Sequence, residues 1–306
     1  MVDKVEKIWF DGSLVDWDQA NVHVLTHTLH YGLGVFEGIR CYKLGNGKSA
    51  IFRLEEHIER LFESAHICTL PMPYSPEQIA QACLETVRVN KLSECYLRPL
   101  AFIGAGAMGL GAMDNPTHVS IIAWKWGAYL GDEGIAKGIR AKVASFARPG
   151  INSVMAKGKV VGHYVNSILA KREVLAAGYQ EAIMLDGQGY VSEASGENIF
   201  VVKKGKIYTP PLGSAILGGI TRDSVVTICQ ELGYSLSERT LTRDELYTAD
   251  EIFMCGTAAE ITPVREIDDR KIGIGSRGAI TERVQKRYFE VVRGEGKAYP
   301  QWLAVV

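Results

Sequence analysis

The stretch Ile199-Phe200-Val201-Val202-Lys203-Lys204-Gly205-Lys206-Ile207-Tyr208-Thr209 contains two short apolar runs separated by a tight turn. Lys204-Gly205 lies at its centre, where a glycine favours the sharp turn that joins antiparallel strands. The stretch therefore predicts a β-hairpin. Asp186-Gly187 and Asp11-Gly12 follow other strand-like runs in the same way, so hairpins recur along the chain.

Helices are predicted between these hairpins from the helical spacing of apolar residues and from capping patterns. They are expected at 53–69, from Ser75 onward, at 163–177, at 221–232, after Thr242 and at 280–292. Further strands are expected at 95–103 (interrupted by Pro99), 119–124, 182–185, 252–255 and 261–264. Hairpins outnumber strand–helix–strand units, so the expected fold class is α+β and not a doubly wound parallel sheet.

The length of 306 residues and the hydrophobic content of 47% predict a large core divided between two domains. The glycine-rich segment 126–134 has no clear period and is interpreted as lying in a linker. We expect a small N-terminal α+β domain at 1–123, a linker at 124–136 and a large C-terminal domain at 137–306.

Composition argues against several classes of partner. The net charge is −1 and the pI is about 6.7, so neither nucleic acid nor an anionic membrane is expected to bind. The six cysteines lack a C-x-x-C pair and are interpreted as reduced thiols. The first residues lack the apolar core of a signal peptide, and no apolar run is long enough to cross a membrane. A cytoplasmic protein is expected.

Two patterns suggest other chemistry. Gly104-Ala105-Gly106-Ala107-Met108-Gly109 matches the G-x-G-x-x-G of nicotinamide-dependent oxidoreductases, which define the rival class. Helix breakers follow it at once, so a loop is favoured. His23, His27 and His30 are spaced like metal ligands but lack a nearby carboxylate. Packed or hydrogen-bonded histidines are favoured over a metal site.

Two segments offer candidate catalytic side chains. Lys157 and Lys159 lie among the apolar residues of 154–162, where a lysine that loses its charge becomes nucleophilic. Both would share one face of a strand, so spacing leaves the choice open. Glu193 and Glu197 follow a strand-like run and compete for one carboxylate role. Surface lysines and ordinary turn carboxylates are the alternative interpretation.

Two small-residue turns offer anion sites. Leu217-Gly218-Gly219-Ile220-Thr221 leads into a predicted helix, whose first N–H groups favour phosphate. Gly256-Thr257-Ala258-Ala259 follows a strand and offers further N–H groups. Pyridoxal phosphate (PLP) needs a lysine, a partner for its pyridine nitrogen, a phosphate site and a place for the substrate carboxylate. The chain has a candidate for each.

Longer motifs along essentially the whole chain resemble the branched-chain amino acid aminotransferases of the class IV, or fold type IV, PLP enzymes. They are His30-Tyr31-Gly32-x-Gly34-Val35-Phe36-Glu37-Gly38-Ile39-Arg40, Tyr96-Leu97-Arg98-Pro99-Leu100, Trp126-Gly127-Ala128-Tyr129, Gly219-Ile220-Thr221-Arg222 and Gly256-Thr257-Ala258-Ala259-Glu260-Ile261. The resemblance implies a two-domain fold like that of D-amino acid aminotransferase, with PLP bound by the large domain and the active site at the domain interface. It also implies that L-leucine, L-isoleucine or L-valine donates an amino group to 2-oxoglutarate.

The resemblance assigns catalytic roles to Lys159, which carries PLP, and to Glu193, which pairs with the pyridine nitrogen. Other cofactor-binding residues implied are Arg60, Tyr164, Leu217, Gly219, Ile220, Thr221, Gly256 and Thr257. Substrate-binding residues implied are Tyr31, Phe36, Gly38, Arg40, Tyr96, Arg98, Leu110, Tyr129, Thr257, Ala258 and Ala259. No metal is implied.

Some assignments go beyond what the residue pattern predicts. The helical pattern alone places Arg60 on a solvated face. Tyr31 and Leu110 match residues that the family supplies from a neighbouring subunit, which implies a homodimer or a higher homo-oligomer, up to a hexamer. Ala194 stands where the family usually has glycine. Relatives with the same fold act on D-amino acids or R-amines, or as aminodeoxychorismate lyases, and form the alternative within this cofactor class.

Overall fold

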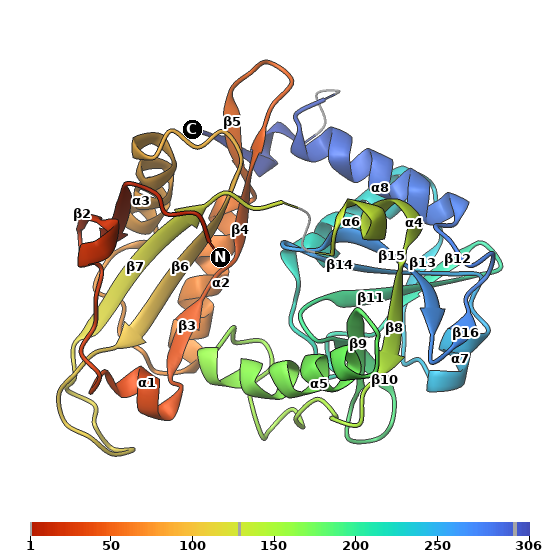
Figure 1. The fold of residues 1–306 in the computed structure, drawn as a ribbon, viewed down its shortest axis with the longest axis horizontal. Coiled ribbons are helices and arrows are strands. Elements are labelled where there is room, and N and C mark those ends of the chain that lie inside the picture. Colours follow the sequence, from red (N-terminus) through yellow and green to blue (C-terminus); the bar gives the residue numbers. More distant parts are fainter. Residues whose placement is uncertain (1, 128–129, 296–298) are drawn as a thin grey trace. The chain divides into compact units, whose positions relative to one another are not determined.

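The computed structural model describes residues 2–127, 130–295 and 299–306 of the chain. These residues form two compact units, each with its own sheet (Figure 1). Unit 1 comprises Met1–Trp126, Gly158–His163 and Val291–Val306, and unit 2 comprises Gly127–Lys157 and Tyr164–Glu290. Two segments from the range expected for the second domain thus pack in unit 1. Each compact unit is therefore made of segments that are separated in the sequence.

Unit 1 is built on an antiparallel sheet of eight strands, as counted within the described residues. Its order is β17 (Leu303–Val305), β5 (Ser49–Phe52), β4 (Ile39–Lys43), β6 (Cys95–Ile103), β7 (Thr117–Trp124), β1 (Lys7–Phe10) and β2 (Ser13–Asp16), and β3 (Gly34–Phe36) also pairs with β6. The β1–β2 pair confirms the hairpin predicted at Asp11-Gly12, and β6 and β7 confirm two predicted strands.

Pro99 was expected to interrupt the strand at 95–103, and this expectation is wrong because β6 continues through it. In an antiparallel ladder, the N–H and C=O of one residue point to the same neighbouring strand. The Pro99 carbonyl accepts from the Glu37 N–H (2.8 Å), and Glu37 lies in the gap between β3 and β4. The N–H that proline lacks would point into this gap, where the neighbouring strand is already broken.

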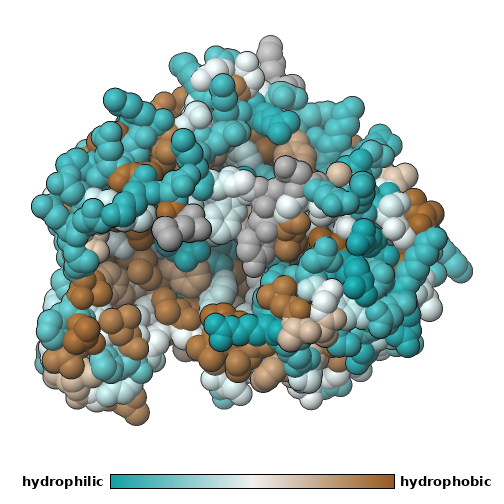
Figure 2. Space-filling view, viewed as in Figure 1, coloured by the Kyte–Doolittle hydropathy of each residue, from teal (hydrophilic) through white to brown (hydrophobic). Residues whose placement is uncertain are grey.

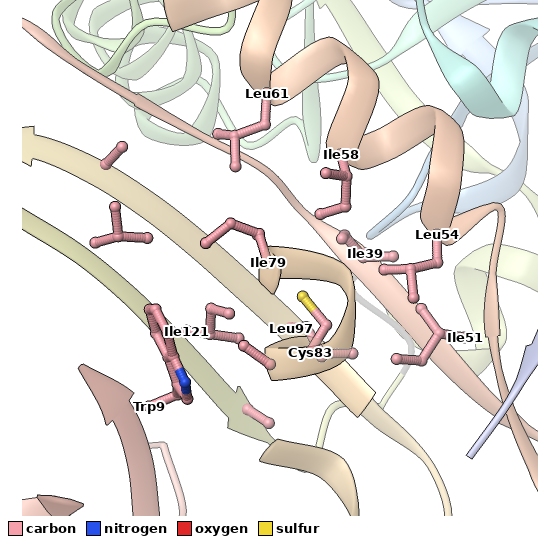
Figure 3. Packing of buried hydrophobic residues seen from close by; sticks show 14 of the residues in the cluster. Trp9, Ile39, Ile51, Leu54, Ile58, Leu61, Ile79, Cys83, Leu97 and Ile121 are labelled. Carbon is pink, nitrogen blue, oxygen red and sulfur yellow. The ribbon is translucent and has the colours of Figure 1, made fainter. Parts of the chain in front are cut away.

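Two helices, α2 (Leu54–Ile67) and α3 (Pro76–Val89), pack their apolar faces on this sheet. Figure 3 shows side chains of both helices directed toward strand residues: Leu54, Ile58, Leu61, Ile79 and Cys83 from the helices, and Trp9, Ile39, Ile51, Leu97 and Ile121 from the strands. α3 begins at the predicted capping box, in which Ser75 Oγ accepts from the Gln78 N–H and the Gln78 side chain accepts from the Ser75 N–H. Shorter helices in unit 1 are η1 (Trp17–Gln19), α1 (His27–Tyr31), η2 (Val161–His163) and η3 (Pro300–Trp302).

Unit 2 is built on a mixed sheet of nine strands, again counted within the described residues. Its order is β10 (Val191–Ala194), β9 (Glu181–Leu185), β8 (Ile139–Val143), β15 (Glu260–Ile267), β14 (Glu251–Gly256), β11 (Asn198–Lys203), β12 (Lys206–Thr209) and β13 (Leu236–Glu238), and β16 (Arg270–Lys271) also pairs with β15. The helices are α4 (Asp132–Lys137), α5 (Tyr164–Ala176), α6 (Ile220–Glu231), α7 (Arg243–Tyr247) and α8 (Ala279–Val292). Within the described residues, every helix is too short or too polar to span a bilayer.

The hairpins that predicted the fold class are present in unit 2. β11 and β12 pair antiparallel around Lys204 and Gly205, whose φ angles of 49° and 74° suit the tight turn. β9–β10 and β14–β15 are hairpins as well. Three pairs are parallel: β8 with β9, β8 with β15, and β12 with β13. The α+β prediction is confirmed, although β8 itself was not predicted.

The loop interpretation of the glycine-rich motif is also confirmed. Residues 104–116 contain neither helix nor strand in the described structure. The Asn115 side chain accepts from the Ala107 N–H and donates to the Ala107 carbonyl, so it holds the loop closed. A Cβ on Gly106 would lie 2.4 Å from Asn115 Oδ1. These glycines serve the loop, and the nicotinamide-binding alternative loses its structural basis.

We predict that Leu61→Ala lowers the free energy of unfolding of unit 1 by about 2–5 kcal/mol, because Leu61 is fully buried under α2 and truncation leaves a cavity. Chemical denaturation of the full chain, followed by a probe of unit 1, measures the change. Glu63→Ala, on the exposed face of the same helix, is the matched control and should change stability by less than about 0.5 kcal/mol. A loss as small as that of the control would show that α2 is not packed as described.

Candidate active site

The backbone of Lys159 is held on both sides within unit 1. Its N–H donates to Ser64 Oγ on α2 (3.0 Å), and its carbonyl accepts from the Phe36 N–H of β3 (3.1 Å). The next residue, Val160, forms an antiparallel bridge with Val35. Both polar backbone groups of Lys159 are therefore fixed, whereas Lys157 lies outside this segment and is exposed.

Two glycines fix the end of the same segment. Gly32 has a φ of +74°, and a Cβ on it would lie 3.0 Å from Gly162 Cα. The Gly162 N–H donates to the Gly32 carbonyl (3.0 Å). The positive φ and the close backbone approach disfavour a side chain at Gly32, and a Cβ on Gly162 would lie only 3.2 Å from the Gly32 carbonyl oxygen. The lysine segment therefore lies directly against the end of α1.

The side chains of Lys159 and Arg98 share one aromatic ring. Lys159 Nζ lies 5.1 Å from the centre of the Phe36 ring, and the Arg98 guanidinium lies 4.6 Å from it. Arg98 Nη2 donates to Tyr96 Oη (3.4 Å), and Arg98 Nε is buried without a hydrogen-bond partner among the described residues. The alternative of a structural arginine paired with a core carboxylate finds no such carboxylate in the described structure.

An aromatic wall surrounds Arg98. The centre of the Tyr96 ring lies 5.1 Å from the centre of the Trp124 ring and 5.3 Å from the centre of the Trp126 ring. A Cβ on Gly38 would lie 1.9 Å from Tyr96 Oη, so only glycine leaves room for this tyrosine. Arg40 Nη2 donates to the Trp126 carbonyl (3.3 Å) and so helps to hold the wall. Four of the predicted substrate-binding residues, Phe36, Gly38, Tyr96 and Arg98, thus lie together.

Arg60 is buried, contrary to the solvated face that the helical pattern predicts. Its Nε and Nη2 donate to the two carboxylate oxygens of Glu37, each at 2.8 Å. His57 Nδ1 lies 2.7 Å from the same carboxylate. Burial alone would raise the pKa of Glu37, but Arg60 and His57 outweigh it and hold the pKa far below its usual value. Burial lowers the pKa of His57, against the attraction of Glu37, so a neutral His57 donates its Nδ1–H.

Glu193 is held by charged and polar partners in unit 2. A register shift in β10 between Val191 and Glu193 marks an irregularity of the kind found near active sites. Glu193 Oε1 lies 2.9 Å from Arg148 Nη2. Its Oε2 accepts from Asn198 Nδ2 (3.1 Å) and from the Leu217 N–H (3.2 Å). These contacts favour an ionised carboxylate.

The competing carboxyl, Glu197, has a different environment. Burial, together with the charge of Glu181, raises its pKa to about 8, although Lys171 acts in the opposite direction. Its carboxyl accepts a hydrogen bond from the adjacent Gly196 N–H (3.1 Å). Of the two carboxyls, Glu193 is the better partner for a positively charged pyridine nitrogen.

The first anion-binding turn leads into α6 as predicted. Gly219 has extended backbone and directly precedes the helix, and Thr221 is buried in its first turn. A Cβ on Gly219 would lie 2.0 Å from Asn198 Oδ1, and Asn198 Nδ2 also donates to the Leu217 carbonyl (3.1 Å). Asn198 therefore links the turn to Glu193. The N-terminus of this twelve-residue helix favours an anion.

The second turn, at 256–259, joins β14 to β15, and Thr262 Oγ1 donates to the Ala259 carbonyl within it (2.7 Å). α6 packs on β14, so both turns belong to one part of unit 2. Tyr164 is the first residue of α5. The remaining predicted residues are not joined to either set: Tyr31 and Leu110 are 43% and 89% exposed, and Tyr129 lies outside the described residues.

The three histidines that resemble metal ligands bind backbone groups instead. His27 Nε2 lies 2.9 Å from the Gly109 carbonyl, and His30 Nε2 lies 2.9 Å from the Val24 carbonyl. His23 Nδ1 accepts from the Leu25 N–H (3.1 Å). The interpretation as hydrogen-bonded histidines is confirmed.

Sequence reasoning missed four residues that position the site: Glu37, Ser64, Arg148 and Asn198. Glu37 carries a usable signal, because a carboxylate within the apolar run of 35–39 needs a cation when it is buried. The other three carry none, because their partners are distant in the sequence.

Comparisons with known proteins agree with this geometry. Residues 34–267 match the family described as amino-transferase class IV. A branched-chain-amino-acid aminotransferase of Pseudomonas aeruginosa is 51% identical over 306 residues, which cover 100% of this chain and 99% of that protein.

Solved structures are similar over the same length. The Escherichia coli branched-chain amino acid aminotransferase is 45% identical, with a TM-score of 0.96 and coverage of 98% of this chain and 99% of that chain. The T.th. enzyme with pyridoxamine 5′-phosphate is 48% identical, with a TM-score of 0.95 and 98% of each chain covered. Other structures of that enzyme contain N-(5′-phosphopyridoxyl)-L-glutamate and 4-methylvaleric acid. This chain belongs to the class IV aminotransferase family and, within it, to the branched-chain-amino-acid aminotransferases.

Proposed function

We propose that this protein transfers the amino group of L-leucine, L-isoleucine or L-valine to 2-oxoglutarate, with PLP as cofactor and Lys159 and Glu193 as catalytic residues. The branched-chain transaminase activity follows from family membership, and the residue roles are our inference. The observation that carries them is the fixed backbone of Lys159 beside Phe36 and Arg98, because it joins a nucleophilic lysine to a specificity pocket within unit 1.

The residues present fit PLP. Glu193, held ionised by Arg148, suits a protonated pyridine nitrogen. The N-terminus of α6 and the turn at 256–259 supply N–H donors for phosphate and for the substrate carboxylate. Gly219, Ile220, Thr221 and Thr257 are the proposed phosphate ligands, with Arg60 as a cation and Tyr164 as the partner of the phenolic oxygen. When bound, PLP withdraws the electrons that remain when the substrate Cα loses its proton.

Lys159 has two proposed tasks at one atom. Its Nζ would hold the cofactor covalently at rest, and when free it would take and return the proton of the substrate Cα. Both tasks need a mobile side chain on a fixed backbone. Ser64 and Phe36 hold the backbone of Lys159 at its N–H and its carbonyl, so they provide this fixed base.

The pocket around Arg98 is proposed to accept two kinds of side chain. An aliphatic substrate contacts the rings of Phe36 and Tyr96, whereas the distal carboxylate of glutamate or 2-oxoglutarate pairs with the Arg98 guanidinium. The aromatic neighbours of Arg98 support this, because they leave its charge available for a carboxylate. The T.th. enzyme, which holds both a glutamate adduct and 4-methylvaleric acid, provides a parallel.

A homodimer or higher homo-oligomer is also proposed. Figure 2 shows apolar side chains gathered over α1 with its neighbouring loop, and over α5. The exposed apolar residues there include Val24, Leu25, Leu29, Leu110, Met113, Val165, Ile168 and Leu169. Clusters of this kind on a protein surface usually mark an interface. Exposed Tyr31 and Leu110 are proposed to complete the substrate site of a neighbouring copy.

A cytoplasmic location is the last part of the proposal. All six cysteines are free thiols, and five of them are buried. Unpaired cysteines of this kind are typical of a reducing compartment.

We predict that Lys159, and not Lys157, binds the cofactor covalently. Borohydride reduction of the PLP-loaded protein should fix the cofactor to a single peptide, and mass spectrometry should locate it on Lys159. Lys159→Ala should lose this adduct, whereas Lys157→Ala, the matched control, should keep it. An adduct on Lys157 would contradict the assignment.

Glu193→Gln is expected to retain part of the cofactor, because phosphate contacts hold it separately, and to lose turnover by several orders of magnitude. Each factor of ten corresponds to about 1.4 kcal/mol of transition-state stabilisation. Single-turnover rates and the cofactor content of the purified variant measure the two effects separately. Near-normal turnover would shift the role to Glu197.

Arg98→Leu should weaken the reaction of 2-oxoglutarate far more than that of 4-methyl-2-oxopentanoate. The expected difference is roughly 2–5 kcal/mol, the cost of breaking a buried charge pair from one side. Starting from the pyridoxamine form, the second half-reaction is measured with each keto acid, so that the aliphatic acid serves as the internal control. Equal losses for both acids would show that Arg98 is structural.

A further inference from the structure

Three buried carboxyls lie close together in unit 2 behind the proposed cofactor site. Glu181, Glu193 and Glu197 are 0%, 6% and 5% exposed, and they come from β9, from β10 and from the turn after β10. Lys171 pairs with Glu181, and Arg148 pairs with Glu193. Glu197 forms no ion pair with a described residue, and a buried carboxyl without a paired cation favours its neutral form.

The hydrogen bonds indicate which carboxyl holds the extra proton. Glu181 accepts from Lys171 Nζ, from Ser195 Oγ (2.5 Å) and from the Ala182 N–H (2.8 Å). Glu193 accepts from Arg148, Asn198 and the Leu217 N–H. Glu197 accepts one bond, from the neighbouring Gly196 N–H (3.1 Å). Glu197 has the fewest donors and forms no ion pair in the described structure.

Glu197 also lies beneath the second anion-binding turn. A Cβ on Gly256 would lie 3.3 Å from the Gly196 carbonyl and 3.6 Å from Glu197 Cγ. Gly256 directly precedes Thr257, and the adjacent Asn198 pairs with Cys255 across β11 and β14. A negative charge on Glu197 would therefore lie close to any anion held by this turn, in surroundings that screen it weakly.

We propose that Glu197 is a positioning residue that carries a proton at neutral pH, and that this proton allows the turn at 256–259 to bind an anion. The proposal rests on the function assigned to that turn above. It gives the two glutamates of the same segment opposite tasks: Glu193 must be ionised, and Glu197 must be neutral. When Glu197 loses its proton, the turn should bind phosphate and carboxylate groups more weakly.

The raised pKa of Glu197 agrees with this assignment of the proton. Burial raises its pKa to about 8, with a further contribution from Glu181 on β9 and a smaller one from Glu193, while Lys171 on α5 lowers it. Other charged or ionisable groups near the turn include Cys255 on β14, the buried Arg222 of α6, which acts on Cys255, and the buried Glu260, the register partner of Gly256. The proton should therefore be lost as the pH rises through about 8.

The first test measures the proton itself. The pKa of Glu197 is raised in the folded state, so its contribution to stability is full below the usual value of 4.5 and is lost as the pH rises through about 8. Glu197→Gln, which mimics the neutral acid, should remove this loss. Between pH 5 and pH 9, the folding constant of the variant should gain at least tenfold relative to the natural protein. Glu133→Gln, an exposed carboxylate in the same unit, is the control and should show no such gain.

The second test measures anion binding by the full chain without added cofactor, with inorganic sulfate as the probe in place of a phosphate group. Sulfate is a dianion throughout pH 7–9.5, so its own charge does not change. Affinity in the natural protein and in Glu133→Gln should fall at least fivefold over this range, whereas Glu197→Gln should lose less than twofold. Calorimetry at each pH gives the dissociation constants.

The outcomes separate this inference from the function on which it rests. A sulfate affinity in Glu197→Gln that falls with pH as steeply as in the natural protein would overturn the inference alone. So would an unchanged pH dependence of the folding constant, because Glu197 would then not carry the proton. Failure of the natural protein to bind sulfate at pH 7 would overturn the assigned anion site and the inference with it.

Discussion

The carboxylate of Glu37 is fully buried, and it remains ionised because Arg60 and His57 contact it directly. A buried charge whose partner is removed costs several kcal/mol, so this contact fixes α2 against the link between β3 and β4. α2 then presents Ser64 to the Lys159 N–H, and β3 presents the Phe36 N–H to the Lys159 carbonyl. This buried contact between α2 and the β3–β4 link therefore helps to determine where Lys159, the proposed nucleophile, lies.

A buried ion pair also positions a carboxylate in unit 2. Arg148 pairs with Glu193, and Asn198 connects that carboxylate to the turn before α6, so the proposed partner of the pyridine nitrogen and the proposed phosphate site form one hydrogen-bonded assembly. Neutrality matters as much as charge here. Glu197 lies four residues from Glu193 in the same segment, yet burial without a paired cation gives it the opposite preference. Local sequence would treat these two glutamates as equivalent.

Local signals predicted most helices and the hairpins, because caps and tight turns depend on residues a few positions apart, as at Ser75 and Lys204-Gly205. They did not predict β8, although Ile139, Ala141 and Val143 alternate as buried residues, because its partners β9 and β15 are parallel and distant in the chain. The same limit applied to the site. Periodicity could not choose between Lys157 and Lys159 and placed Arg60 in solvent, since the choice depends on Ser64 and Glu37. The family resemblance assigned roles to Lys159 and Arg60 that spacing could not assign.

The chain passes from one compact unit to the other four times, at 126–127, 157–158, 163–164 and 290–291. The six-residue excursion 158–163 brings Lys159 into unit 1, and the final segment returns to add β17 to the edge of its sheet beside β5. Recombination at a single point in the sequence could therefore not transfer either unit as a whole. A graft of residues 1–126 onto another protein would arrive without Lys159, the proposed nucleophile, and with an open sheet edge, so the two halves of this enzyme are constrained to be inherited together.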